Sequence, residues 1–567
     1  MFRNINFKKK MNRFTLLGFI FLGLIFVSSC TDLDETINTQ VTPDQFFKNE
    51  VQFVSALGDA YTVMATGGDN ASGLGASGGY QALQENTSDE WIIPARGPDW
   101  SEGGNWVRVY NHKWRPESIH VNDAWIMLFS GVNNSNRLIL QFESLLEEGD
   151  VEPELANSFI AELKVLRSYY YLQLLDQFGN VPILRRFDVE QTPGNNPNFQ
   201  EGRTELFNFI DSTVTANIGN LSTNIQETRV RVNKFVGHMV LAKLYMNAEA
   251  YVNEPMWEEA FEQLNKVEEG GYSLTGNFAT NFVEDNGNSP EIIFQIPYDR
   301  VNLTGFNIPM MTLHYQQQNT FELQSQPWNG HSATSQLYNS LIDPDLNPGP
   351  QGEVIGLDGK PTTGTIDDRN RFSVGVQMNA SGTEPIEDAS FGITNDESDI
   401  ERGTWDSSAV VRLTPLVDEL QPNTNRQAGA RILKYDIPRG STPNLSNDFV
   451  IYRYADVILL KAEAMMRMSG NENNPQALEL VNKIRTRASV EPFEVLTFDK
   501  LLTERGRELF YELVRRTDLI RFEGKEGETR FNDSWRFKGV SESFRNVFPI
   551  PTDQMETNER LVQNPGY

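Results

Sequence analysis

The chain has 567 residues, of which 39% are hydrophobic and 11% aromatic, so it can bury a large core and is not compositionally disordered. Its 49 Lys and Arg against 77 Asp and Glu give a net charge of −28, which disfavours binding to nucleic acid or to anionic lipid head groups. The single cysteine excludes an intrachain disulfide and any zinc or iron–sulfur site built from several cysteines.

The N-terminal segment predicts a lipoprotein signal peptide over residues 1–29. A basic stretch over 1–13 precedes an apolar run from Phe14 to Val27, which is shorter than the roughly 20 residues that a membrane-spanning helix needs. Two serines then precede Cys30, the pattern of a lipobox in which the cysteine becomes the acylated first residue of a bacterial lipoprotein. We therefore expect lipid on Cys30, a tether over 30–43, and export to the outer face of an outer membrane, as the acidic stretch 31–35 indicates.

Apolar residues at helical spacing predict a mainly α fold in which residues 44–567 form one compact body. The expected helical segments are about 44–65, 117–148, 153–178, 201–217, 231–252, 255–268, 448–469, 474–488 and 497–522. Glycines that suit left-handed caps follow several of them, at Gly149, Gly179 and Gly470. The body thus divides into an N-terminal helical scaffold (44–269), a loop-rich insertion (270–447) and C-terminal helices with a tail (448–567).

Two similar segments predict helical hairpins of the tetratricopeptide type. Residues 260–267 and 477–484 share Ala, Glu, Asn and Lys in register, and each follows a longer helix that contains small residues. A proline, Pro255 or Pro475, lies near the start of each second helix, and Ala260 or Ala477 begins its packing face. We expect a few such hairpins to serve as the scaffold.

Long irregular loops are expected to form the ligand face. Residues 67–116 and about 270–447 are rich in Gly, Pro, Asn, Ser and Asp. Ordering so much irregular backbone costs conformational entropy, and a protein that served only as a scaffold would not need such long loops. The stretch 72–79 matches G-x-G-x-x-G and G-x-S-x-G, but a helical run precedes it where both motifs need a strand, so a flexible loop is predicted there.

Tryptophans in these loops are the main candidates for ligand contact. Trp91, Trp100, Trp106 and Trp114 lie among Pro, Gly, Asn and Asp, where flat apolar rings suit stacking against a sugar. The alternative is that they form a small core that anchors the loop, and both interpretations stay open. Trp328, in another loop, is a further candidate.

Basic residues give the 67–116 loop a local positive charge. Arg96 and Arg108 belong to this group and are candidate ligand-binding residues, because guanidinium groups bind carboxylates and sulfates. The alternative is that they balance the many neighbouring acidic residues.

No catalytic residue, cofactor or metal site is predicted. A glycosidase needs two carboxylates about 5 to 9.5 Å apart, and a chain this rich in acidic residues leaves room for such a pair. The motifs RYAD at 453–456 and ERGRE at 504–508, however, place acid and base three or four residues apart, which is typical of ion pairs within helices. The five histidines show no metal-binding spacing, and only a Ca²⁺ site built from oxygen ligands stays open.

Segments spread over nearly the whole chain resemble the SusD/RagB family of outer-membrane nutrient-binding lipoproteins. In family order they are the lipobox at 27–30, TPDQFF at 42–47, residues 125–136, LRSYY at 166–170, FGNVPI at 178–183, YRYADV at 452–457, KAEA at 461–464, NKIRTRA at 482–488, residues 504–509, DLIR at 518–521, FPIP at 548–551 and QNPGY at 563–567. Gly506 and residues 512–514 depart from the family pattern, which more often has an Arg and a Glu-Gly pair there.

This resemblance implies a tetratricopeptide-like scaffold with a loop-built ligand face, held at the cell surface by lipid on Cys30. It also implies a lid on a TonB-dependent, SusC-like outer-membrane transporter, to which the protein delivers oligosaccharide without chemistry. The predicted partners are thus an oligo- or polysaccharide, that transporter, and the membrane through the anchor only. A surface glycoside hydrolase and a peptide-collecting relative are the alternative functions.

Overall fold

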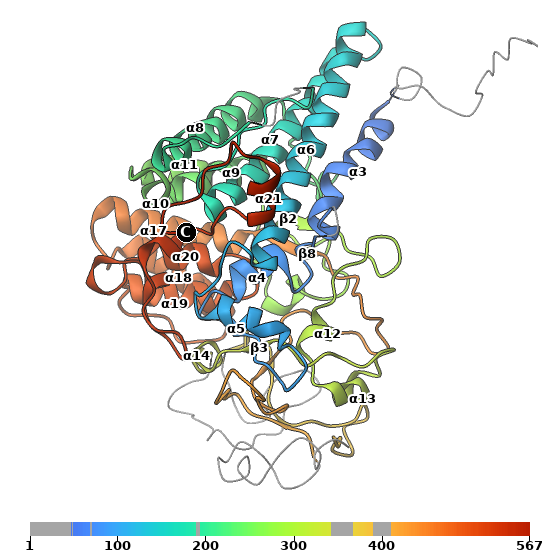
Figure 1. Ribbon diagram of the computed structural model, residues 1–567, viewed down its shortest axis with the longest axis vertical. Coiled ribbons are helices and arrows are strands. Elements are labelled where there is room, and N and C mark those ends of the chain that lie inside the picture. The colour runs from blue at the N-terminus through green and yellow to red at the C-terminus, as the bar shows by residue number, and fades with distance from the viewer. Residues whose placement is uncertain (1–46, 48, 69–70, 189–192, 342–366, 389–409) are drawn as a thin grey trace, which may run out of the picture. The chain divides into compact units, whose positions relative to one another are not determined.

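A computed structural model describes residues 47, 49–68, 71–188, 193–341, 367–388 and 410–567 (Figure 1). The chain separates into two units, residues 1–48 and 49–567, and the elements below belong to the second. Cys30, the predicted signal peptide and the tether lie outside the described residues, so lipid attachment stays a prediction. Within the described ranges, no helix has both the length and the apolar composition that crossing a membrane requires.

The second unit is mainly helical, as the apolar periodicity predicts. Its α-helices are α3 (Glu50–Thr66), α4 (Gly79–Glu85), α5 (Asn105–Tyr110), α6 (Ile119–Glu148), α7 (Pro153–Phe178), α8 (Phe199–Asn217), α9 (Lys234–Met246), α10 (Ala248–Val252), α11 (Trp257–Glu268), α12 (Ile308–Thr312), α13 (Gln318–Phe321), α14 (Ser335–Ser340), α17 (Tyr454–Ser469), α18 (Pro475–Arg487), α19 (Phe498–Leu509), α20 (Arg515–Arg521) and α21 (Thr552–Thr557). Caps explain several ends: Gly149 and Gly470 adopt the left-handed conformation after α6 and α17, with φ of 77° and 61°.

Small residues let the long helices pack closely. α6 packs against both α3 and α7. A Cβ on Gly131 of α6 would lie 2.3 Å from the ring of Tyr170 on α7, so only glycine fits at that crossing. The hydroxyl of Tyr170 in turn donates to the carbonyl of Ala60 in α3, at 2.7 Å.

Both predicted hairpins form, and they are neighbours in space although the whole loop-rich insertion (270–447) lies between them in sequence. α9 packs on α11, α17 packs on α18, and α11 packs on α17 (Figure 1). Ala260 and Ala477 are fully buried at these contacts. The tetratricopeptide-like scaffold is therefore continuous, and the loop-rich insertion leaves it and returns to it between the two hairpins.

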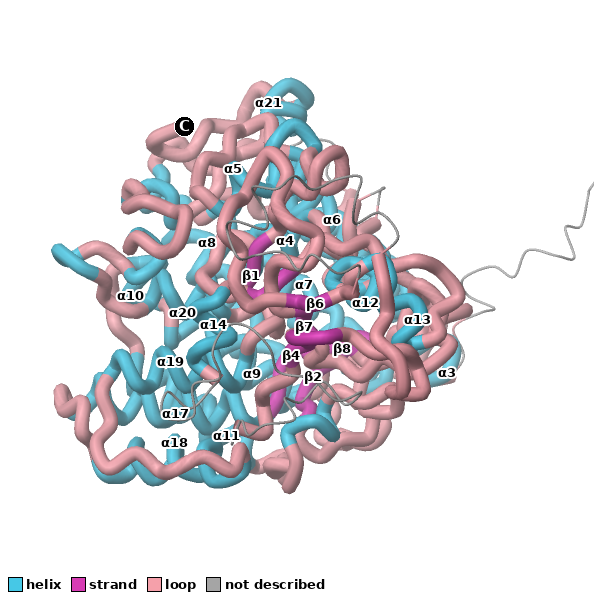
Figure 2. Tube along the Cα trace, turned by 90° about the horizontal axis from the view of Figure 1, so that it is seen from below, coloured by secondary structure: helices cyan, strands magenta, loops and turns pink. Residues whose placement is uncertain are grey.

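Short strands organise the insertion. The described strands form antiparallel pairs: β1 (Trp91–Ile92) with β3 (Ser332–Ala333), β2 (Ile292–Ile296) with β8 (Phe449–Arg453), β4 (Phe372–Ser373) with β7 (Arg431–Ile432), and β5 (Gly375–Val376) with β6 (Arg412–Leu413). Figure 2 shows these pairs between the helices and the loops. The β2–β8 pair joins the two ends of the insertion, and the loops that carry α12, α13 and α14 lie below the helices in Figure 1.

A network of buried charges surrounds Arg453 at the end of β8. Its guanidinium lies 2.7 Å from Glu291, 2.5 Å from Glu508 of α19 and 2.7 Å from Glu512. Burial by itself would raise the pKa of Glu508, but Arg487, Arg453 and Arg369 hold that pKa below its ordinary value. Taking these charges out of water is costly, so the network stabilises the fold only when every partner is present.

The two charged motifs therefore act mainly between elements rather than within helices. Glu504 and Arg507 form the predicted intrahelical pair, at 3.2 Å. Arg453 instead binds partners on other elements, as described above, and Asp456 pairs with Lys243 of α9 and with Arg505 of α19. The prediction of intrahelical pairs is wrong for these side chains, because both motifs are buried where several elements meet.

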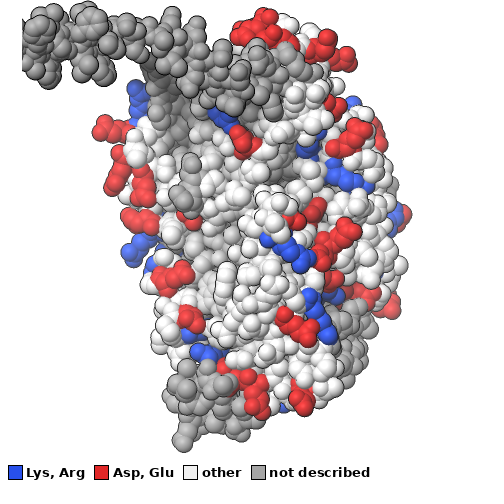
Figure 3. All heavy atoms as spheres, turned by 90° about the vertical axis from the view of Figure 1, so that its right-hand side faces the viewer, with Lys and Arg blue, Asp and Glu red and all other residues white. Residues whose placement is uncertain are grey.

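Acidic and basic side chains are interspersed on the face that Figure 3 shows, around a broad area with few charges. The net charge of −28 is thus not gathered into one acidic patch on that face. The charge at a given site is therefore set by the residues around it rather than by the net charge of the chain.

We predict that Arg453→Met lowers the free energy of unfolding by about 3 to 5 kcal/mol, because it leaves buried carboxylates without their partner. Chemical denaturation of residues 31–567 measures this loss. Lys266→Ala is the matched control: it removes an exposed pair with Glu269, at 2.8 Å, and we expect no measurable change. Equal stability of wild type and Arg453→Met would contradict the prediction.

Candidate functional site

Three of the four tryptophans in the 67–116 loop are buried. Trp91, Trp106 and Trp114 expose 1%, 3% and 1% of their surface. The ring of Trp106 lies 4.1 Å from that of His120, and the Trp114 indole donates to the hydroxyl of Tyr567 at 2.7 Å. The prediction that these three contact a ligand is therefore wrong: they form the loop-anchoring core that the sequence left as the alternative.

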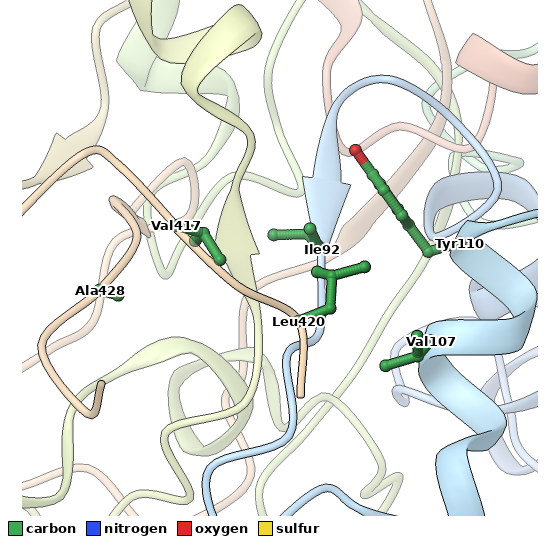
Figure 4. Close-up of a cluster of buried hydrophobic side chains, with 6 residues drawn as sticks. All are labelled: Ile92, Val107, Tyr110, Val417, Leu420 and Ala428. Atoms are coloured by element: carbon green, nitrogen blue, oxygen red, sulfur yellow. The ribbon is translucent and has the colours of Figure 1, made fainter. Parts of the chain in front are cut away.

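A neighbouring apolar cluster joins this loop to the insertion (Figure 4). Ile92, Val107 and Tyr110 from the loop pack against side chains from the insertion, which are Val417, Leu420 and Ala428. Burial of these groups offsets the entropy of ordering two irregular segments that lie far apart in the chain.

Arg96 is also buried, with 2% of its surface exposed, so it does not present its guanidinium to a ligand. It donates instead to the carbonyls of Asn425 and Ala428 and to the hydroxyl of Ser332, and so it holds the insertion against the loop. This corrects its assignment as a ligand-contacting residue. Arg108 is partly exposed and donates to the carbonyl of Gly103, so it braces the same loop.

Trp100, which is half-buried, and Trp328, which is exposed, form a pair. The Trp100 indole donates to the backbone carbonyl of Trp328 at 2.7 Å, and Trp328 is 40% exposed. Gly330 lies directly against the Trp100 ring, since a Cβ there would come within 2.4 Å of it. The structure thus brings these two predicted site residues together, and Gly330 lets the second loop lie flat against the first.

Three residues that the sequence analysis did not single out complete this surface. The hydroxyl of Tyr315 donates to the carboxylate of Asp99, which precedes Trp100. The Arg426 guanidinium lies over the Tyr315 ring, 4.9 Å from its centroid. We call Trp100, Trp328, Tyr315, Asp99 and Arg426 the aromatic platform.

The backbone holds the aromatic platform in an uncommon conformation. Trp100 and Asn329 both have left-handed φ values, of 58° and 57°, which cost free energy in residues other than glycine. Hydrogen bonds hold Asn329 in this geometry. Its backbone N–H donates to the carbonyl of Leu313 at 3.0 Å, and its side-chain amide donates to the carbonyl of Arg426 at 3.1 Å. Strain of this kind, maintained at a partly exposed aromatic pair, is typical of a ligand site.

The aromatic platform offers stacking surfaces and hydrogen-bonding groups rather than a catalytic pair. Its rings are partly exposed, and Asp99 and Arg426 provide an acceptor and donors beside them. Asp388, the other carboxylate near Arg426, is buried. Across the described ranges no cluster of three or more His, Cys, Asp or Glu is arranged to hold a metal ion, and the Ca²⁺ question stays untested.

The comparisons with known proteins agree on one family. Residues 290–567 match the model of the SusD family. The starch-binding protein SusD of Bacteroides thetaiotaomicron is 22% identical over 487 residues, which cover 82% of this chain and 82% of that protein. A SusD-like protein of Formosa agariphila is 22% identical over 585 aligned positions, which cover 97% of this chain and 98% of that protein.

Solved structures are similar in fold. Surface glycan-binding protein A of Bacteroides uniformis has a TM-score of 0.65 at 19% identity, covering 91% of this chain and 99% of its own. A laminarin-binding SusD-like protein has a TM-score of 0.62 at 20% identity, covering 92% of this chain and 100% of its own. The helical scaffold and its loop-built face are thus an arrangement found in known proteins.

We predict that the tryptophans separate into two classes by their effect on stability. Trp106→Ala should lower the free energy of unfolding by about 3 to 5 kcal/mol, because it empties a packed site. Trp328→Ala should change that free energy by no more than about 1 kcal/mol, because 40% of the Trp328 surface is already in solvent. Chemical denaturation of the two variants tests both values, and similar losses in both would contradict the assignment of core and platform.

Proposed function

Since this chain belongs to the SusD family, we propose that it binds an oligo- or polysaccharide on the aromatic platform as a surface-exposed lipoprotein, without catalysis. The observation that carries the proposal is the partly exposed Trp100–Trp328 pair, joined by a hydrogen bond and held by strained backbone. Pyranose rings have flat faces of C–H groups, which suit stacking on such rings. The names of the starch-binding and laminarin-binding relatives support a glycan as the ligand class.

Binding without chemistry is the function that fits the carboxylates best. Hydrolysis of a glycoside needs two carboxyl groups that flank the scissile bond. At the aromatic platform, Asp99 already accepts a hydrogen bond from Tyr315, and Asp388 is buried away from solvent. A surface glycoside hydrolase is therefore the weaker candidate, and assays for new reducing ends decide between the two.

We further propose that the protein hands its saccharide to a SusC-like TonB-dependent transporter in the outer membrane. The support is the lipobox at 27–30, which would keep the protein at the membrane surface, together with family membership. Anchored there, the loop-built face raises the local concentration of saccharide for an adjacent transporter.

We predict that Trp100→Ala and Trp328→Ala each weaken glycan binding by about tenfold or more, because each removes one stacking surface. Isothermal calorimetry of residues 31–567 against a broad panel of oligo- and polysaccharides measures the change. Phe187→Ala, which removes an exposed aromatic ring from the scaffold, is the control and should bind as wild type does.

Two results would overturn the proposed function, one for its binding site and one for the absence of catalysis. One is unchanged affinity in both tryptophan variants. The other is release of reducing ends from any glycan of the panel by the wild-type protein. Binding of peptides in place of glycans would support the alternative function, in which the protein collects peptides.

We predict that Cys30→Ser releases the protein from the outer-membrane fraction and abolishes its co-purification with a barrel transporter. The thiol is the site of lipid attachment, so the serine variant lacks the anchor. Membrane fractionation followed by affinity purification of the full-length chain tests both outcomes. Retention of Cys30→Ser in the membrane at wild-type levels would contradict lipidation at this residue.

A further inference from the structure

Two buried arginines lie behind the aromatic platform without a carboxylate partner among the described residues. Arg96 and Arg431 expose 2% and 0% of their surface. Arg96 donates only to carbonyl and hydroxyl oxygens, and Arg431 donates to the carbonyl of Arg426 at 2.7 Å and the hydroxyl of Ser332 at 2.6 Å. These neutral acceptors bind the terminal N–H groups of both side chains, the Nε of each has no partner among the described residues, and a neutral acceptor does not cancel the positive charge.

The pKa shifts of the groups in this region agree with its buried arginines. Burial lowers the pKa of Arg96 to about 10, and burial followed by repulsion from Arg96 lowers that of Arg431. Burial also lowers the pKa of His314, and Arg431, Arg96 and Arg426 lower it further, so the three guanidinium groups lie around one neutral imidazole. Arg96 still carries its charge at neutral pH, since a pKa of about 10 lies well above 7, and guanidinium groups in proteins stay protonated in general.

Arg426 connects this buried charge to the surface. Its side chain is 22% exposed, it lies over the Tyr315 ring, and its carbonyl accepts from Arg431. Its carboxylate neighbour is Asp388, at 3.5 Å, which also lies 3.6 Å from His314. Among the described residues, the three guanidinium groups thus lie around His314, and the carboxylate that contacts one of them is Asp388 beside Arg426, in a chain with a net charge of −28.

We propose that the aromatic platform selects an anionic saccharide, one that bears uronate carboxylates or sulfate esters, and places its negative group against Arg426. The inference rests on the proposed function and names the substrate class of the same site. Arg426 would bind the anion through its exposed N–H groups while Trp100 and Trp328 stack on the sugar rings. Arg96 and Arg431 contribute through the field of their charge, since neither reaches the surface.

The test compares matched probes that differ only in charge. Calorimetry of residues 31–567 uses oligogalacturonate against its methyl ester, and a sulfated galactan oligosaccharide against its desulfated counterpart. We expect at least one charged probe to bind about tenfold or more tightly than its neutral partner, with an affinity that falls as salt is added. Which pair shows the preference distinguishes a carboxylate from a sulfate ligand.

Arg426→Gln should remove that preference and the salt dependence, so that the charged and the neutral probe of each pair bind this variant equally. Arg426→Lys, which keeps the charge, should retain part of the preference, and thermal unfolding confirms that both variants fold. Arg186→Gln is the matched control: it removes an exposed scaffold arginine that pairs with Asp188 at 2.8 Å, and the preference should persist.

The possible outcomes separate this inference from the proposed function. Equal affinity for charged and neutral probes, or a preference that survives in Arg426→Gln, overturns the anionic ligand and leaves glycan binding intact. Binding to none of the probes and to no glycan of the broad panel overturns both.

Discussion

The ion network around Arg453 is the constraint on which the rest of the molecule depends. It joins the end of β8 to α19 and, through Glu508, to Arg369 in the insertion, whose guanidinium also binds Glu504 at 2.7 Å. All of these side chains are buried. Since an unpaired buried charge costs several kcal/mol, the insertion can return to the scaffold only along a path that completes the pairs. A long irregular segment thereby acquires a definite position.

That position determines where the ligand face forms. The 67–116 loop and the insertion have little secondary structure of their own, and each is ordered by the other. Arg96 and the cluster of Ile92, Val107 and Tyr110 join the loop to the insertion, and β1 of the loop pairs with β3 of the insertion. The partly exposed Trp100 and Trp328 come from these two segments, so the aromatic platform exists only where the segments meet.

Tryptophans of one loop thus have two physical roles. Trp91, Trp106 and Trp114 supply large apolar surfaces that anchor a polar loop, while Trp100 keeps part of its ring in solvent. The same division applies to the arginines: Arg96 carries its charge inside the protein, and Arg426 carries it to the surface. Composition describes neither division, because a net charge and a residue count contain no information about which side chains share an environment.

The sequence by itself determined the helical class, the two hairpins and the caps at Gly149 and Gly470, because helix periodicity and capping act over a few residues. Its short motifs also carried the family resemblance. The tertiary structure alone decided which tryptophans are buried and that Tyr315 and Arg426 join Trp100. Those facts follow from contacts such as that between Arg96 and Asn425, which lie 329 residues apart. No local pattern encodes such a contact, since it depends on how buried charges and apolar clusters close the insertion onto the scaffold.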